Sequence, residues 1–245
     1  MAKAKKGARL SINQSRKFIL SDSTQFVIKE AYKTARANLV FSLATCEAKS
    51  VIVTSCAPAE GKSTNCLNLA ITMAETGASV LLVDADMRKP VQHSLLKLDN
   101  KKGLSSILGG ITSDVGKAIK KDVRDNLDVL TSGPIPPNPA ELLSGKRMAE
   151  LLDIVSKHYD YVFIDTPPVT VVTDAFLMSE IVAGIVFIVK ESSTTHVEIN
   201  EALMKAKMMN AKVLGMIKVN CNYKGKSGYT SYKYKYKYNY EYKNN

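Results

Sequence analysis

The residues best suited to chemistry lie within residues 51–64, which read VIVTSCAPAEGKST. The stretch begins with a β-branched apolar run typical of a buried strand, and Lys62 and Ser63 open a segment with helical spacing. A strand, a loop of small residues, Gly-Lys-Ser and a helix are the context that a phosphate-binding P-loop requires. In such a loop the backbone N–H groups bind the β-phosphate of a nucleotide, Lys62 reaches the β- and γ-phosphates, and the Ser63 hydroxyl binds Mg²⁺.

The motif departs from the P-loop pattern at one position. The pattern G-x-x-x-x-G-K-[ST] places its first glycine where this sequence has Cys56. The alternative is a strand-to-helix turn that carries a lysine by chance, and the correct flanks on both sides argue against it. We therefore predict a nucleotide-binding loop made of Ala57, Pro58, Ala59, Glu60, Gly61, Lys62, Ser63 and Thr64.

Three aspartates follow two further apolar runs of the sequence. Asp165 comes directly after one of them, which is the Walker B arrangement of a carboxylate that completes the Mg²⁺ shell directly or through water. Asp84 and Asp86 end the other run, and their spacing predicts that both side chains project the same way from an extended chain. They could hold Mg²⁺ and accept a proton from a nucleophile. The predicted catalytic residues are Lys62, Asp84, Asp86 and Asp165, and the predicted metal ligands are Ser63, Asp84 and Asp165.

A parallel sheet is needed to bring these residues together. Short apolar runs alternate with helical segments along the chain, and continuous apolar strands are typical of a parallel sheet covered on both faces. The pattern predicts an α/β fold of the P-loop NTPase kind, with a doubly wound, mostly parallel sheet and helices on both faces. Strands are expected at residues 51–53, 80–83, 127–130, 161–164, 185–189 and 213–219, and helices at 25–43, 103–110, 114–119, 138–157 and 197–209.

The net charge of +11 belongs to the two ends of this 245-residue chain. Residues 1–17 contribute +6 and residues 223–245 contribute +5, so residues 18–222 are formally neutral. We predict three parts: a basic flexible arm (1–17), a P-loop domain (18–222) and a tyrosine-rich flexible tail (223–245). A nucleic-acid-binding domain would carry its basic charge on the fold, so no nucleic-acid partner is expected.

The sequence also favours a cytoplasmic protein. No apolar run approaches the length of a bilayer span, and no signal peptide is visible at the N-terminus. The four cysteines have neither metal-binding spacing nor the pattern of a disulfide framework, which fits a reducing compartment.

The last 23 residues hold eight of the eleven tyrosines, most of them alternating with lysine or another polar residue. An edge strand and a stacking platform for single-stranded nucleic acid are alternatives. A phosphoacceptor tail explains better why phenols gather beyond a nucleotide-binding domain. A phenol with a pKa near ~10 needs a base to react at neutral pH, and Asp84 or Asp86 could supply it. The predicted acceptors are Tyr229, Tyr232, Tyr234, Tyr236, Tyr238, Tyr240 and Tyr242.

Taken together, these motifs resemble those of bacterial tyrosine kinases of the capsular and exopolysaccharide type, in their stand-alone cytoplasmic form. The resemblance rests on residues 57–64 as Walker A, 83–90 as a second acidic motif, 163–168 as Walker B, 133–143, and the tyrosine-rich end. Two positions depart from the family. Ala59 stands where glycine is usual, and the subunit-contact motif Glu-x-x-Arg-x-x-Arg reads Glu30, Lys33, Arg36.

The resemblance implies an ATP- and Mg²⁺-dependent kinase that phosphorylates its own tail in trans within a homo-oligomeric ring. It implies that the kinase also phosphorylates tyrosines of other proteins. It implies a ring contact through Glu30, Lys33 and Arg36, which share one helical face. It also implies a separate transmembrane activator that recruits a cytoplasmic protein to the membrane, and a role in capsular or exopolysaccharide synthesis.

Two other functions compete with this reading. A partition-type P-loop ATPase switch would carry a signature lysine where this sequence has Ala57, and it would lack the tyrosine tail. A non-enzymatic scaffold with a vestigial site is disfavoured because Lys62, Ser63 and all three aspartates are intact.

Overall fold

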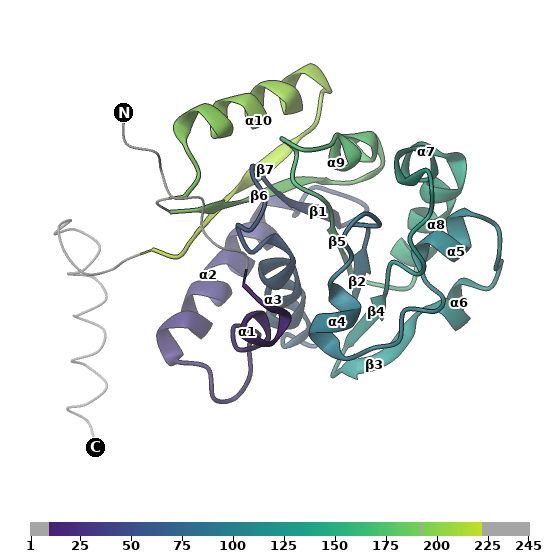
Figure 1. Cartoon of the computed structure of the whole chain (residues 1–245). Coiled ribbons are helices and arrows are strands. Elements are labelled where there is room, and N and C mark those ends of the chain that lie inside the picture. Colours follow the sequence, from purple (N-terminus) through teal and green to yellow (C-terminus); the bar gives the residue numbers. More distant parts are fainter. Residues whose placement is uncertain (1–9, 192, 222–245) are drawn as a thin grey trace, which may run out of the picture.

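The computed structural model describes residues 10–191 and 193–221. Its centre is a seven-stranded sheet of order β3-β4-β2-β5-β1-β6-β7, in which every pair is parallel except the edge pair β3–β4 (Figure 1). This confirms the predicted doubly wound α/β fold. The strands are β1 (Ser50–Ser55), β2 (Val80–Asp84), β3 (Lys120–Arg124), β4 (Leu127–Leu130), β5 (Tyr161–Asp165), β6 (Gly184–Lys190) and β7 (Val213–Val219).

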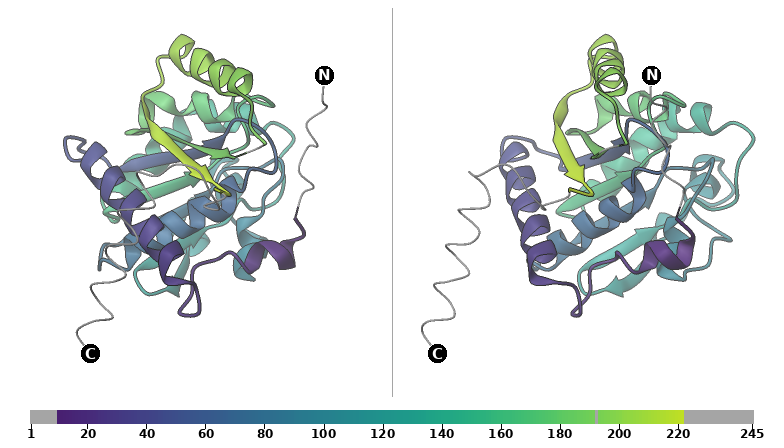
Figure 2. Two further views of the ribbon diagram at one scale, coloured as in Figure 1. Left: turned by 90° about the vertical axis from the view of Figure 1, so that its left-hand side faces the viewer. Right: turned by 60° about the vertical axis from the view of Figure 1, so that its left-hand side comes forward.

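Helices cover both faces of the sheet because successive strand residues point to opposite sides. Ile52 and Leu81 belong to one buried core, whereas their neighbours Val51, Val53 and Leu82 belong to the other. Helices α2 (Phe26–Ser42) and α3 (Lys62–Ala74) cover the face of the sheet that carries Val51, Val53 and Leu82, and Figure 2 shows the two helices side by side. The first core receives α5 (Leu104–Leu108), α6 (Val115–Ala118), α7 (Pro139–Ser144), α8 (Lys146–Ser156), α9 (Asp174–Leu177) and α10 (His196–Met208).

Some features of the fold differ from the predicted elements. The helix expected over residues 138–157 is two helices, because Gly145 adopts an extended conformation (ψ 155°) between α7 and α8. Strand β3 was not expected, since its sequence KKDVR is polar and lies at the exposed edge of the sheet. Helix α4 (Gln92–Leu96) is only five residues long and carries no clear helical pattern. Among the described residues, no helix combines the length and the apolar run that a bilayer crossing requires.

Part of the segment predicted as a basic flexible arm, residues 1–17, is helical. Residues 12–16 form helix α1 (Ile12–Arg16), which begins with a capping box between Ser11 and Gln14. The Arg16 guanidinium donates to the carbonyl of Ser94 in α4, so this helix is attached to the domain. Residues 1–9 and the tail tyrosines lie outside the described residues.

Candidate active site

The register of the sheet brings the predicted site residues to one edge. Asp165 at the end of β5 lies opposite Val53 of β1 on one side and opposite Asp84 of β2 on the other. The loop after β1 leaves the sheet at this edge and leads into α3, whose first residues are Lys62 and Ser63. Parallel strands place their carboxyl ends together, and this is where ligands bind in such folds.

The turn into α3 depends on backbone conformations that favour glycine. Gly61 has φ 83°, and a Cβ atom added there would lie 3.2 Å from Nδ2 of Asn65. That Asn65 amide donates to the Gly61 carbonyl at 2.9 Å. Ala59 also has a positive φ, 65°, although it carries a side chain. The glycine that the resemblance leads one to expect at position 59 would adopt this conformation without strain.

A substitution tests the strain at Ala59. A left-handed conformation costs an L-residue about 1–2 kcal/mol, and glycine avoids that cost. Glycine also raises the conformational entropy of the unfolded chain, which offsets part of the gain. Ala59→Gly should therefore raise the free energy of unfolding by up to about 1 kcal/mol. Urea denaturation measures this. Ala57→Gly is the control, because Ala57 is not among the residues with positive φ and gains nothing. Equal changes in the two variants would contradict the explanation.

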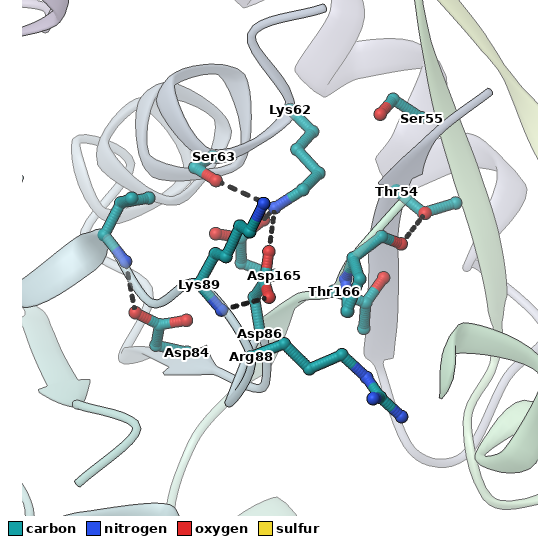
Figure 3. A network of polar contacts seen from close by, with 12 residues as sticks. Thr54, Ser55, Lys62, Ser63, Asp84, Asp86, Arg88, Lys89, Asp165 and Thr166 are labelled. Carbon is teal, nitrogen blue, oxygen red and sulfur yellow. Dashed lines mark hydrogen bonds and ion pairs between the residues drawn. The ribbon is translucent and has the colours of Figure 1, made fainter. Parts of the chain in front are cut away.

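Lys62 lies at the centre of the site (Figure 3). Its Nζ is 2.8 Å from Oδ2 of Asp86, 3.3 Å from Oδ1 of Asp165 and 3.1 Å from Oγ of Ser63. Burial lowers the pKa of Lys62, but the charges of Asp165 and Asp86 raise it by more, so the pKa lies above its ordinary value. Lys62 therefore stays protonated and can bind phosphate oxygens.

Asp84 and Asp86 do not direct their carboxylates the same way, contrary to the expectation from their spacing (Figure 3). Strand β2 ends at Asp84, whose Oδ2 accepts the backbone N–H groups of Val91 (3.1 Å) and Gln92 (3.0 Å). Asp86 instead accepts the Lys89 N–H at 3.0 Å and pairs with Lys62. Asp86 therefore faces the lysine, and Asp84 faces the start of α4.

Burial, with the charge of Asp165 next, raises the pKa of Asp84 to about 8. A carboxyl whose folded pKa exceeds its unfolded pKa stabilises the fold most at low pH and loses that contribution as pH rises through the folded value. Asp84→Asn stays neutral, so it should gain stability relative to the wild type between pH ~4 and the folded pKa. Urea denaturation across this range measures the difference. A constant difference would contradict the assignment.

The structure adds contacts that the sequence does not predict, with Thr194 and Asp174 as the new partners. Glu60 is buried; its Oε2 accepts the Ala57 N–H at 3.0 Å and its Oε1 accepts the Thr194 hydroxyl, which links the P-loop to the loop after β6. Arg88 binds buried Asp174 through two hydrogen bonds of 2.8 and 3.1 Å, which attaches the acidic loop to α9. No spacing in the sequence connects these partners, because each pair is brought together only by the fold.

The predicted contact residues Glu30, Lys33 and Arg36 lie on α2. Lys33 pairs with Glu30 at 2.8 Å within the same helix. Arg36 donates from Nη1 to the Thr72 carbonyl of α3 at 2.6 Å.

The oxygen donors fit Mg²⁺. In the part of the chain that the structure describes, no three His, Cys, Asp or Glu side chains form a self-sufficient metal site. Mg²⁺ does not need one, because it usually binds one or two carboxylates together with substrate phosphates and water. Ser63 Oγ and Asp165 lie side by side, and Asp84 Oδ1 is buried without a hydrogen-bond partner. These are hard oxygen ligands of the kind that Mg²⁺ prefers.

Fold and site together define a nucleotide-binding α/β domain of the P-loop class. Residues 48–205 match the family described as AAA domain. The chain is 43% identical over 188 residues to tyrosine-protein kinase YwqD of Bacillus subtilis, covering 77% of this chain and 79% of that protein. The kinase domain of Escherichia coli tyrosine kinase ETK superposes with a TM-score of 0.75 at 30% identity, covering 82% and 80% of the two chains. The chimerical protein CapA2B2 superposes with a TM-score of 0.76 at 38% identity, covering 80% and 86%.

The chain belongs to the bacterial tyrosine-protein kinases. The competing interpretation, a partition-type ATPase, is a distant structural relation only. A plasmid partition protein from Borrelia burgdorferi superposes with a TM-score of 0.58 at 19% identity, covering 77% and 86%, which indicates a shared fold.

Proposed function

We propose that this chain transfers the γ-phosphoryl group of ATP to tyrosine hydroxyls, including those of its own C-terminal tail. The observation that carries the proposal is the buried group of Lys62, Asp86 and Asp165 at adjacent strand ends, next to Ser63. In the reaction the bond between the γ-phosphorus and the leaving oxygen of ADP breaks, and a bond from the phenol oxygen to that phosphorus forms. The phenol proton passes to a carboxylate.

Each residue has a task that follows from its position. The P-loop backbone of residues 57–64 and Lys62 bind the phosphates. Asp86, which faces Lys62, accepts the phenol proton once Lys62 turns to the phosphates. Ser63, Asp84 and Asp165 would hold Mg²⁺, which would supply positive charge to offset that of the phosphates.

The acceptors and partners form a second part of the proposal. Tail tyrosines 229, 232, 234, 236, 238, 240 and 242 receive phosphate in trans from a neighbouring copy in a homo-oligomer. Other protein tyrosines are further substrates, and nucleic acid is not a partner. The protein works in the cytoplasm, is recruited to the membrane by a separate transmembrane activator, and regulates capsular or exopolysaccharide synthesis. Support comes from the family membership and from the placement of the tyrosines.

The experiment is incubation of the purified chain with ATP labelled in the γ-phosphate, followed by acid hydrolysis and identification of the labelled amino acid. Label in phosphotyrosine supports the proposal, and ATP labelled in the α-phosphate should leave the protein unlabelled. Release of all label as inorganic phosphate would support the partition-type ATPase instead.

The proposed ring contact yields its own prediction. Reversing the charges at Glu30 and Arg36 together should convert the oligomer to monomers, provided that each faces an oppositely charged group of the neighbouring copy that the two substitutions leave unchanged. Light scattering measures the mass, and the interaction should weaken with salt, since lysine at position 33 lacks the bidentate geometry of arginine. The control reverses the exposed pair Lys146 and Glu150 of α8, which should leave the mass unchanged. Oligomers of unchanged mass in the α2 variant would refute this interface.

A further inference from the structure

Gln92 occupies a position that connects the three parts of the site. It is fully buried and is the first residue of α4. Its backbone N–H donates to Oδ2 of Asp84 at 3.0 Å. Its side-chain Nε2 donates to Oδ2 of Asp165 at 2.9 Å and to the carbonyl of Ser63 at 3.0 Å. One residue therefore contacts the ends of β2 and β5 and the first turn of the P-loop helix.

The orientation of the Gln92 amide follows from its partners. A carbonyl oxygen and a carboxylate oxygen both accept hydrogen bonds, so the group between them must be the NH₂ end of the amide. Oδ2 of Asp165 is thereby held by Gln92, while Oδ1 of the same carboxylate faces Lys62 at 3.3 Å. The two oxygens of Asp165 have separate partners, and this fixes the plane of its carboxylate relative to Ser63.

Only one end of the Gln92 amide is paired. Its Oε1 is buried and has no hydrogen-bond partner, and an unpaired buried acceptor is destabilising. An apolar side chain of similar length would avoid that cost but would leave Oδ2 of Asp165 and the Ser63 carbonyl without this donor. The amide is explained by what its NH₂ group holds.

We propose that Gln92 is a positioning residue that orients the Asp165 carboxylate and the first turn of α3 for the magnesium–nucleotide complex. The inference rests on the proposed function, because it assigns Gln92 a role behind the residues that would hold Mg²⁺. Side chains that orient metal ligands typically change metal affinity or activity by about 10–100-fold when they are replaced.

The test compares ADP binding to the full chain with and without Mg²⁺, measured by calorimetry. In Gln92→Met the Mg²⁺-free affinity for ADP should stay near that of the wild type, because the P-loop backbone and Lys62 remain. The tightening that Mg²⁺ produces should fall by about tenfold or more. In steady-state kinetics, kcat should fall and the KM for ATP should change little at saturating Mg²⁺.

Asn68→Leu is the matched control. Asn68 lies in α3 and, like Gln92, carries a fully buried amide. Its Nδ2 donates to two acceptors, the Phe18 carbonyl and the Tyr32 hydroxyl. Both variants lose stability through lost hydrogen bonds, but only the Gln92 variant should lose the effect of Mg²⁺. Gln92→Ala serves as a second variant should the methionine fail to fold.

The results distinguish failure of the positioning role of Gln92 from failure of the proposed function. A folded Gln92 variant with the wild-type response to Mg²⁺ would overturn the positioning role, and so would an equal loss in Asn68→Leu. If the wild-type chain itself failed to bind ADP with Mg²⁺, the proposed function would fail and not only the inference.

Discussion

Lys62→Met should abolish phosphotyrosine formation and also destabilise the protein. The lysine is the cation that pairs with Asp86 and Asp165, and its side chain is only 12% exposed. Without it the phosphates lose a charge-assisted donor in a site from which water is largely excluded. From the sequence alone one expects little change in stability. The structure predicts a loss of about 3–5 kcal/mol at neutral pH, because two buried carboxylates lose their partner.

Phosphotyrosine immunoblotting and urea denaturation measure the two effects. The destabilisation should shrink as pH falls, because burial raises the pKa of Asp165, and once that carboxyl is protonated it no longer needs the lysine. Lys49→Met is the control, since Lys49 lies over the ring of Tyr161 at the other end of the sheet and should leave phosphotransfer unchanged. Phosphotyrosine at the wild-type level in the Lys62 variant would contradict the assignment of this site.

Asp86→Asn should lower kcat by about 10²–10⁴-fold and leave the affinity for ATP nearly unchanged. An amide keeps the shape of the side chain but cannot accept the phenol proton, so the loss falls on the transition state. Asp84→Asn should also slow the reaction, because it removes a predicted Mg²⁺ ligand and not the base. A high Mg²⁺ concentration should therefore restore part of the lost rate. Single-turnover kinetics at varied Mg²⁺ separates the two. A higher ATP requirement with full maximal rate in both variants would rule out the base.

The sequence predicts the fold well, for physical reasons, and it picks out Lys62, Asp86 and Asp165, which the fold brings into contact. Strands buried on both faces are continuously apolar, so β1, β2, β5 and β6 are visible as runs. Two of them, β2 and β5, end in the predicted site residues Asp84 and Asp165. Strand β3 escapes prediction because an exposed edge strand has no apolar pattern.

The finer geometry of the site is not encoded locally. The spacing of Asp84 and Asp86 suggests a shared direction, but β2 ends at Asp84 and each carboxylate then binds the backbone of a different turn. Gln92 carries no motif, and its contacts with Ser63 and Asp165 join segments 29 and 73 residues away. Only the assembled sheet brings these groups together.

The central claim is that this P-loop domain phosphorylates tyrosine. The most direct measurement is mass-spectrometric mapping of the full chain after incubation with ATP and Mg²⁺, with the Lys62→Met protein treated in parallel. We expect phosphate on several of the tyrosines between positions 229 and 242 in the wild type and none in the variant. Consumption of ATP with no phosphotyrosine anywhere in the wild-type chain would contradict it.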